Sequence, residues 1–431
     1  MASTPQAPTG VAQGSVRATL WILLLVYIFN FIDRQIVNIL AEPIARELGL
    51  SDTQIGLLTG LAFALFYTAL GLPIARYADR GTTHRPRLIA VALATWSAMT
   101  ALCGLAQNYW QLLLARIGVG VGEAGCTPPA HSLIADLVPA QRRSSAIAFY
   151  SLGIPIGSLL GLVIGGVLAD WVGWRMAFLA VGLPGVALAL LVWFLLREPR
   201  YEGVLRQARE NAPPEMPMGQ AVRSVLGSRA FVLLLVAGST AAFLAYGKVT
   251  WTTIFFQRTH GMTPGEVGFW FGIINGFAGA AGTFLGGWLA DRYGAQNRRH
   301  VLTAPAVGMA VAVPIAILAY QAASWQTALA LLVLPTLFNS LYYGPVYSAA
   351  QGLVPIRSRA IAAATLLFFQ NLIGLGLGPL FFGVLSDWLQ PTYGTDSVRY
   401  VLYGAALLGL VPAFFFWRAS LRLNEELDRK D

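Results

Sequence analysis

Long apolar segments alternate with short polar ones along almost the whole chain. Each apolar segment is about as long as the ~20 residues with which an α-helix crosses a bilayer. The pattern predicts an all-α membrane protein with twelve transmembrane helices, because a helix satisfies its own backbone hydrogen bonds inside lipid. The predicted helices lie at residues 19–45, 53–76, 87–107, 109–137, 144–170, 175–196, 230–257, 264–290, 301–321, 325–353, 359–389 and 398–419.

The longest polar stretch inside the chain divides these segments six and six. It runs from Arg197 to Arg229 and contains six arginines and four prolines. We therefore expect an N-terminal six-helix bundle at residues 1–197, a cytoplasmic linker at 198–228, and a C-terminal six-helix bundle with a cytoplasmic tail at 229–431.

The composition agrees with a membrane protein and excludes several other classes. Hydrophobic residues make up 56% of the chain and charged residues 11%, whereas a soluble domain has about 25% charged residues. A water-soluble enzyme and a disordered chain are therefore excluded. Both cysteines, Cys103 and Cys126, fall in apolar segments, so we expect no disulfide framework, metal site or cofactor.

The net charge of +9 follows from the predicted topology. With the N-terminus in the cytoplasm, 22 of the 29 Lys and Arg residues lie on the cytoplasmic side, four lie outside and three lie within spans. This is the bias of the positive-inside rule. We expect a multi-pass protein of the cell inner membrane with both termini in the cytoplasm and without a nucleic-acid partner.

The two halves of the chain repeat each other. The motif at residues 51–60 (Ser-x-x-Gln-x-Gly-x-x-x-Gly) recurs at 263–272 (Thr-x-x-Glu-x-Gly-x-x-x-Gly), and residues 77–80 recur at 289–292. Each copy of the first motif is typical of a capping box that opens a helix. The repeats predict two pseudo-symmetric bundles.

A weaker signature, small-x-x-small-Asp, closes four predicted helices. It ends at Asp79 and Asp291 on the cytoplasmic side, and at Asp170 and Asp387 on the outer side. The same signature on opposite faces suggests inverted three-helix units within each half, as in secondary transporters.

The segment from Ala75 to Gly81, followed by His84-Arg-Pro-Arg, resembles the loop signature between helices 2 and 3 of the major facilitator superfamily, with Ala75 in place of the usual Gly. The resemblance implies the major facilitator fold. Asp79 can bond the N-terminus of a neighbouring helix and pair with cytoplasmic arginines, although ordinary surface charge at a helix end is the alternative. The expected conformational gate consists of Asp79, Arg80, Arg142, Arg143, Asp291 and Arg292.

Charged residues inside the predicted spans are functional candidates, because burying a charge in a membrane is costly. Asp33 lies in the first span, and Arg116 and Glu123 lie seven residues apart on one face of the fourth. Burial in a low-dielectric cavity favours the protonated carboxyl group, whereas a nearby guanidinium favours the charged one. We expect Asp33, Arg116 and Glu123 to couple proton uptake to conformation. A static buried ion network is the alternative.

Polar residues in four spans are candidates for substrate contact. Arg34 and Lys248 are expected to meet a charged head group, although Lys248 could instead extend to a membrane interface. The predicted substrate-binding residues are Arg34, Asn30, Lys248, Tyr343, Asn339 and Asn371.

The predicted fifth helix carries a stripe of glycines, Gly153, Gly157, Gly161 and Gly165. Spacing by four allows a neighbouring helix to pack closely. The stripe resembles the helix 5 motif of proton antiporters in the superfamily, from which it departs at Pro155.

Four stretches are similar to the spinster branch of the superfamily: Phe29–Arg34, Arg116–Ala124, Leu133–Asp136 and Arg142–Gly157. Animal members export lysolipids and sphingosine phosphate. The resemblance implies a proton-coupled secondary active transporter that works by alternating access, and a partner that is an amphipathic lipid (lysolipid or sphingolipid-like) or another small molecule. The alternatives are a proton-coupled carrier of drugs or small organic anions, and a non-transporting membrane receptor or scaffold. We expect a monomer surrounded by membrane lipids, and no enzymatic activity.

Overall fold

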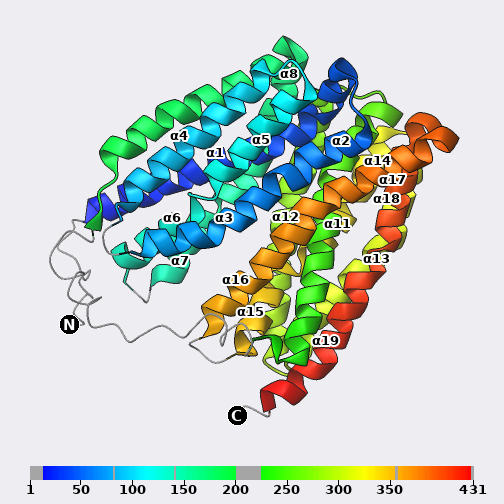
Figure 1. Ribbon diagram of the computed structural model, residues 1–431. Helices are drawn as coiled ribbons and strands as arrows, with labels where there is room; N and C mark the ends of the chain where they lie inside the picture. The colour runs from blue at the N-terminus through cyan, green and yellow to red at the C-terminus, as the bar shows by residue number, and fades with distance from the viewer. Residues whose placement is uncertain (1–12, 81–82, 140–141, 200–224, 355–357, 429–431) are drawn as a thin grey trace. The chain divides into compact units, whose positions relative to one another are not determined.

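Helices account for most of the chain (Figure 1). The computed structural model describes residues 13–80, 83–139, 142–199, 225–354 and 358–428, and no strand occurs among them. In chain order the helices are α1 (Gln13–Leu48), α2 (Asp52–Gly56), the π-helix η1 (Leu57–Leu61), α3 (Ala62–Asp79), α4 (Arg85–Leu105), α5 (Tyr109–Glu123), α6 (Thr127–Leu137), α7 (Arg143–Ser151), α8 (Gly153–Leu195), α11 (Arg229–Thr259), α12 (Pro264–Gly294), α13 (His300–Gln321), α14 (Trp325–Ser340), α15 (Tyr343–Gly352), α16 (Arg359–Phe369), the π-helix η5 (Gln370–Leu377), α17 (Gly378–Tyr393), the 3-10 helix η6 (Gly394–Asp396), α18 (Ser397–Leu407) and α19 (Leu410–Asp428).

The helices match the twelve predicted segments. Within the described residues, nine helical stretches are long and apolar enough to cross a membrane. Two of them, Ser145–Leu195 and Ile361–Leu423, each cover two predicted segments; the first is broken at Gly173, whose φ of 82° interrupts α8. The remaining predicted segment, 109–137, is divided between α5 and α6, which are each too short to count alone.

Contacts group the chain into two compact units. Unit 1 contains Met1–Val37 and Leu65–Pro214, and unit 2 contains Asn38–Ala64 and Glu215–Asp431. The unit boundaries fall inside two continuous helical runs, α1 and α2–η1–α3. The predicted bundle limits at residues 197 and 229 stay a prediction.

Within unit 1, glycines bring α8 against α1. A Cβ on Gly157 would lie 2.5 Å from the backbone oxygen of Ile28, and one on Gly161 would lie 2.9 Å from that of Ile32. These distances are too short for a side chain, so only glycine fits. The predicted close packing along the glycine stripe is therefore confirmed, and the neighbouring helix is α1.

Unit 2 has a hydrophobic core built by five of its helices. Phe231 and Leu234 of α11 pack with Leu302 of α13, Val346 of α15 and Phe416 of α19, all fully buried. The first half of α11 contributes more residues to this core than any other helix.

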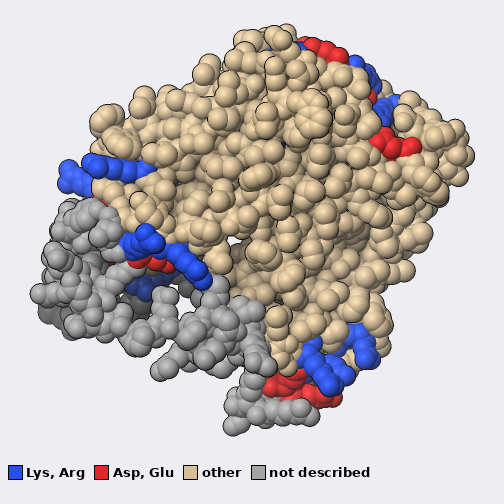
Figure 2. All heavy atoms as spheres, in the orientation of Figure 1, with Lys and Arg blue, Asp and Glu red and all other residues tan. Residues whose placement is uncertain are grey.

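Large apolar side chains also cover much of the surface. Trp171, Phe284 and Phe194 expose 80%, 78% and 77% of their area. Figure 2 shows that charged side chains gather towards helix ends, while the broad areas between them are uncharged. Such a surface suits the hydrocarbon of a bilayer.

Candidate functional site

Unit 1 holds a group of charged side chains in its interior. Asp33 of α1 and Glu123 of α5 are completely buried, and Arg116 of α5 is 1% exposed. Glu123 and Arg116 act electrostatically on the Asp33 carboxylate, which also faces Trp96 and Thr100 of α4. The structure therefore brings the three predicted proton-coupling residues together. Their role in proton coupling stays a prediction.

Glycines on α5 explain how the buried charges reach α4. A Cβ on Gly122 would lie 2.6 Å from the backbone nitrogen of Trp96, and one on Gly118 would lie 2.7 Å from the Met99 side chain. Close approach of the two helices places Glu123, which follows Gly122, beside the polar side chains of α4. The sequence thus builds a polar interior from small residues.

Arg34 of α1 completes the buried group. Its Nε donates to Oε2 of Glu123 at 2.5 Å. Its guanidinium lies over two rings, with Cζ 4.5 Å from the centroid of Tyr67 and 5.1 Å from that of Phe31. Each cation–π contact is worth about 0.5–2 kcal/mol. Arg34 is therefore held from three sides, and its bond to Glu123 was not foreseen from the sequence.

The buried group is balanced in formal charge. Asp33 and Glu123 contribute two carboxylates, and Arg34 and Arg116 contribute two guanidinium groups. A buried ion pair is tolerated when each charge has an opposite partner, and loss of one charge leaves another uncompensated. One added proton on either carboxylate would leave the group with a net positive charge. Asn30, also fully buried, lies beside Glu123.

The other predicted substrate-binding residues belong to unit 2. Lys248 is half-buried on α11, and no hydrogen bond or ion pair joins it to another described residue. Asn339 of α14 and Asn371 of the π-helix η5 are half-buried. Tyr343 of α15 stacks on Tyr342 with ring centroids 4.4 Å apart. These residues lie on four elements of unit 2, and their contact with a substrate stays a prediction.

The predicted gate residues of unit 1 lie at helix ends. Asp79, at the end of α3, is exposed and accepts a hydrogen bond from Ser132 Oγ at 3.0 Å. Arg80 lies 5.7 Å from the ring centroid of Tyr77. Arg143 donates from Nε to the backbone oxygen of Val138 at 3.1 Å.

The remaining gate residues are exposed. Arg142 precedes α7 as its N-cap residue, and its side chain is exposed. Asp291 and Arg292 of α12 are exposed in unit 2, and Arg292 lies 5.9 Å from the ring centroid of Trp288. The gating role of all six residues stays a prediction.

Arg85 makes a buried ionic contact that sequence reasoning missed. Its side chain is completely buried at the start of α4 and forms ion pairs with Glu198 and, at 2.6 Å, with Asp136. It also donates to Ser132 Oγ at 3.2 Å, the hydroxyl that donates to Asp79. Arg85 thereby links the start of α4 to the second half of α6 and to the segment that follows α8.

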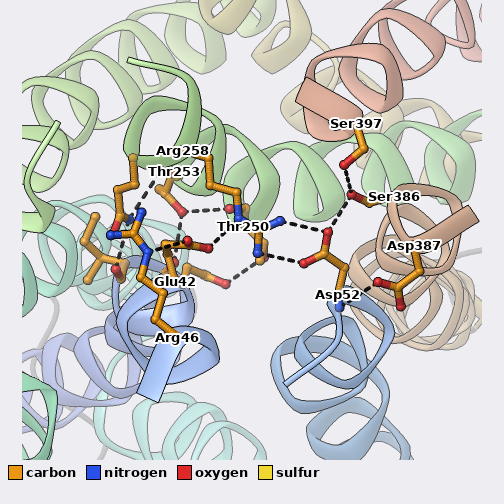
Figure 3. Close-up of polar contacts among 12 residues, drawn as sticks. Glu42, Arg46, Asp52, Thr250, Thr253, Arg258, Ser386, Asp387 and Ser397 are labelled. Atoms are coloured by element: carbon orange, nitrogen blue, oxygen red, sulfur yellow. Dashed lines mark hydrogen bonds and ion pairs between the residues drawn. The ribbon is translucent and has the colours of Figure 1, made fainter. Parts of the chain in front are cut away.

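A second ionic group lies in unit 2 (Figure 3), and we call it the Arg258 cluster. Arg258 at the end of α11 donates from Nε to Glu42 at 2.6 Å, and from both terminal nitrogens to Asp52 at 2.9 and 2.7 Å. Asp387 of α17 accepts from the backbone nitrogens of Asp52 and Thr53 at 3.0 and 2.8 Å. Ser386 donates to Asp52 at 2.6 Å. The cluster holds the end of α1 and the start of α2 against α11 and α17.

A row of polar bonds continues from the Arg258 cluster along α1 (Figure 3). Thr250 donates to the Asn38 side chain at 2.7 Å, and Thr253 donates to the Asn38 backbone oxygen at 2.9 Å. Gln257 donates to the backbone oxygen of Ile39 at 3.3 Å. One face of α11 thus follows α1 for about two turns.

The sequence contained one signal for the Arg258 cluster. Asp387 ends one of the four small-x-x-small-Asp signatures, but its partner at the start of α2 could not be identified from spacing. As to metals, no group of three or more His, Cys, Asp or Glu residues lies close enough to bind an ion within the described parts of the chain.

The architecture and the buried charges together identify the class of protein. The family model of the Major Facilitator Superfamily matches residues 23–299 and again residues 249–430. The chain therefore belongs to the Major Facilitator Superfamily, and the predicted fold class is confirmed. It is a membrane-spanning transporter of a small-molecule substrate and not an enzyme.

Comparison with individual relatives shows which type of transporter within the superfamily the chain resembles. An "MFS-type efflux pump" of Mycolicibacterium smegmatis is 36% identical over 412 residues, which is 95% of this chain and 94% of the relative. "Protein spinster homolog 1" of Homo sapiens is 27% identical over 451 residues, 99% of this chain and 84% of the relative. A crystal structure of a bacterial homolog to the human lysosomal transporter spinster, inward-facing and unoccupied, matches with a TM-score of 0.87 at 30% identity, over 96% of this chain and 99% of that chain. The transporter is of the spinster type, as its motifs predicted.

Proposed function

We propose that this transporter couples the movement of protons to the export of amphipathic lipids, lysolipid or sphingolipid-like, by alternating access. The observation that carries the proposal is the balanced group of two carboxylates and two arginines buried in unit 1. Transport does not require a buried charge, and retaining four of them in a membrane protein is costly. Exchange of a proton by this group would explain why the buried charges are kept despite that cost.

The geometry supplies a way to couple a proton to substrate binding. While Glu123 is ionised, it holds Arg34 through the 2.5 Å bond. Protonation of Glu123 removes that charge, and Arg34 then keeps its contacts with Tyr67 and Phe31 while the buried group carries one excess positive charge. An anionic head group can neutralise it, because a guanidinium binds phosphate or carboxylate oxygens with two parallel hydrogen bonds. Protonation of Asp33 would likewise remove a carboxylate charge that acts on Arg116.

The amphipathic substrate is supported by the resemblance to the spinster branch, whose animal members export lysolipids and sphingosine phosphate, and by the aromatic rings around Arg34. A head-group site next to Tyr67 and Phe31 suits a ligand with one charged and one apolar end. We further propose Asn30, Lys248, Asn339, Tyr343 and Asn371 as substrate contacts.

The placement in the cell remains part of the proposal. The excess of Lys and Arg on one side of the predicted topology supports the inner membrane and cytoplasmic termini. We also propose that residues 1–197 and 229–431 act as the two halves of a monomer, with 198–228 as a cytoplasmic linker.

Flux into proteoliposomes under an imposed pH gradient tests the proposal. We expect the gradient to drive lysolipid flux in the wild type, and Asp33→Asn and Glu123→Gln to lose the response. The matched control is Glu47→Gln, since Glu47 is an exposed carboxylate on the same helix as Asp33. If both core variants keep gradient-driven flux, the assignment of the coupling residues is wrong.

A second candidate substrate class is drugs or small organic anions. The relative of 36% identity that is described as an efflux pump favours it. A panel of cationic dyes and organic anions in the same assay separates the classes, because a lipid carrier moves lysolipids but not the panel. A non-transporting receptor would bind ligand without flux and would tolerate Glu123→Gln.

A further inference from the structure

The last helix of unit 2, α19, changes from apolar to charged towards its end. Up to Trp417 its exposed residues are apolar, among them Leu410, Phe414 and Trp417 itself, which expose 48%, 52% and 44% of their area. The next exposed residue, Arg418, is charged. Tryptophan is enriched where a membrane helix passes from the hydrocarbon to the head groups. The change at Trp417 therefore marks where α19 reaches the head groups of the bilayer.

Two hydrogen bonds join the last turn of α19 to the first turn of α11. The carboxylate of Glu426 accepts them from the Ser228 hydroxyl and, at 2.9 Å, from the backbone nitrogen of Ala230. Ser228 is the N-cap residue of α11, so the carboxylate also lies at the positive end of the helix dipole. Arg229 of α11 and Arg422, one turn before Glu426, are therefore at the same end of unit 2.

Three arginines at this end have no counter-ion, and we call Arg229, Arg418 and Arg422 the α19 arginine patch. Figure 2 shows basic side chains gathered beside the end of α19, next to acidic ones. Within the described residues, no hydrogen bond or ion pair joins a side chain of the patch to another residue. The acidic side chains do not neutralise the patch, because Glu426 is bonded to the start of α11 and the exposed Glu425 forms no ion pair with a described residue.

The patch is unfavourable without an anion. Arg418 and Arg422 are one turn apart, and like charges at this spacing repel each other along a helix. Arg229 occupies the first position of α11, where a cation opposes the helix dipole. An exposed arginine elsewhere in unit 2, Arg292, at least lies over the ring of Trp288, whereas no described ring lies over a member of the patch.

We propose that the α19 arginine patch binds the phosphate of an anionic phospholipid, whose acyl chains lie along the apolar face that ends at Trp417. A guanidinium binds phosphate oxygens through two parallel hydrogen bonds. Two arginines one helical turn apart, with Cβ atoms about 5–6 Å from each other, can reach one phosphate together. Basic residues beside a membrane attract anionic head groups. A free phosphate would meet the same guanidinium groups but would gain nothing from the apolar face.

The bound lipid has a structural consequence for unit 2. A negative charge at the patch offsets the repulsion between Arg418 and Arg422 and the unfavourable charge of Arg229, beside the bonds of Glu426. The lipid therefore stabilises the junction of α11 with α19. Lipid binding at the patch depends on neither the substrate nor proton coupling, because all the residues involved belong to unit 2 and none of them lies in the buried charged group.

Quenching of Trp417 fluorescence by brominated lipids in vesicles tests the proposal. The signal of Trp417 is the difference between each protein and the same protein with Trp417→Phe. The vesicles are phosphatidylcholine with added phosphatidylglycerol or phosphatidylcholine that is brominated on its acyl chains. We expect phosphatidylglycerol to be preferred at this site by roughly 20-fold, since each arginine beside an anionic head group contributes about fivefold in affinity. In Arg418→Gln/Arg422→Gln the preference should disappear.

The matched control is Arg299→Gln/Arg359→Gln. It removes the same charge from unit 2, but these exposed arginines stand at the starts of two different helices, α13 and α16, so the preference at Trp417 should not change. Arg418→Lys/Arg422→Lys, which keeps the charge but loses the planar fork, should fall between the wild type and the glutamine pair. Should the glutamine pair fail to fold, Arg422→Gln alone decides, with an expected fall of about fivefold.

Four results would overturn the proposal. They are a wild type without preference for phosphatidylglycerol at Trp417, an unchanged preference in the glutamine pair, an equal loss in the control pair, and displacement of the lipid by millimolar inorganic phosphate. The last result would show that the patch binds phosphate without the lipid. No substrate and no pH gradient enter the measurement, so failure of lipid flux or of proton coupling leaves its result standing.

Discussion

Replacing Arg85 by methionine tests how a buried charge holds the start of α4. The side chain of Arg85 is completely buried, and that of its partner Glu198 is 1% exposed. Arg85 also pairs with Asp136, whose side chain is 28% exposed. Methionine fills much of the same volume but donates no hydrogen bond, so the two carboxylates lose their cation.

The magnitude follows from the burial of the carboxylate that stays behind. Asp136 can recover solvent, but Glu198 cannot. Removing one partner of a buried ion pair costs about 3–5 kcal/mol, most of it from the uncompensated charge. The backbone bond from Arg85 N to Glu198 at 2.8 Å survives the change and keeps the estimate near the lower end of that range. We expect the free energy of unfolding to fall by about 3 kcal/mol.

Reversible chemical unfolding in micelles measures this loss, with Arg87→Met as the control. Arg87 lies two residues further on, is exposed, and makes a cation–π contact with Trp193 at 5.4 Å, which is worth about 0.5–1 kcal/mol. The double variant Arg85→Met/Glu198→Met should regain part of the loss, because a buried pair can often be replaced by apolar residues. The reasoning fails if Arg85→Met costs no more than Arg87→Met, or if the double variant is less stable than either single variant.

Three further changes have defined outcomes. Gly157→Ala should destabilise the protein by about 1–3 kcal/mol, because the added Cβ would meet a backbone oxygen of α1 at 2.5 Å. The control is Gly71→Ala on α3, where the added Cβ meets open space, and it should be neutral or stabilise the protein by up to ~1 kcal/mol. Tyr67→Leu should cost about 0.5–2 kcal/mol of unfolding free energy through the ring 4.5 Å from Arg34, whereas an equal loss in Tyr67→Phe would contradict the cation–π explanation. Burial lowers the pKa of His260, which follows α11. The contribution of this histidine to the free energy of unfolding is therefore complete above about pH 6.5, and it is lost as the pH falls through the lower pKa of the folded state. His260→Phe should therefore flatten the fall in melting temperature on the acid side, and an unchanged slope would contradict it.

The apolar segments predicted most of the fold because their lengths are set by the bilayer and not by the neighbours of each helix. For the same reason, the break at Gly173 lies between residue 170, where one predicted helix ends, and residue 175, where the next begins. The glycine stripe from Gly153 to Gly161 likewise predicted close packing, since the absence of side chains is visible in the sequence. Which helix fills that space could not be predicted, because spacing defines a face but not its partner.

The candidate site was accessible to sequence reasoning only in part. Asp33, Arg116 and Glu123 could be found because a charge in an apolar segment is conspicuous. The bond between Arg34 and Glu123 could not, because it depends on the rotation of α1 relative to α5. The carboxylate partners of Arg258 could not be predicted for a different reason. Polar residues at helix ends are common, and nothing in their spacing distinguishes a side chain that forms an ion pair from one that is solvated.

The π-helix η1 changes which side of one continuous helix faces which neighbour. Gly56 and Tyr67 are eleven residues apart, about three turns of an uninterrupted α-helix, and would share one side. A π turn takes one residue more than an α turn, so Tyr67 is rotated by about 100° from that side. The same helix can therefore present glycine to α17 before η1 and an aromatic ring to Arg34 after it. Deletion of one residue from η1 would remove this rotation and turn Tyr67 away from Arg34.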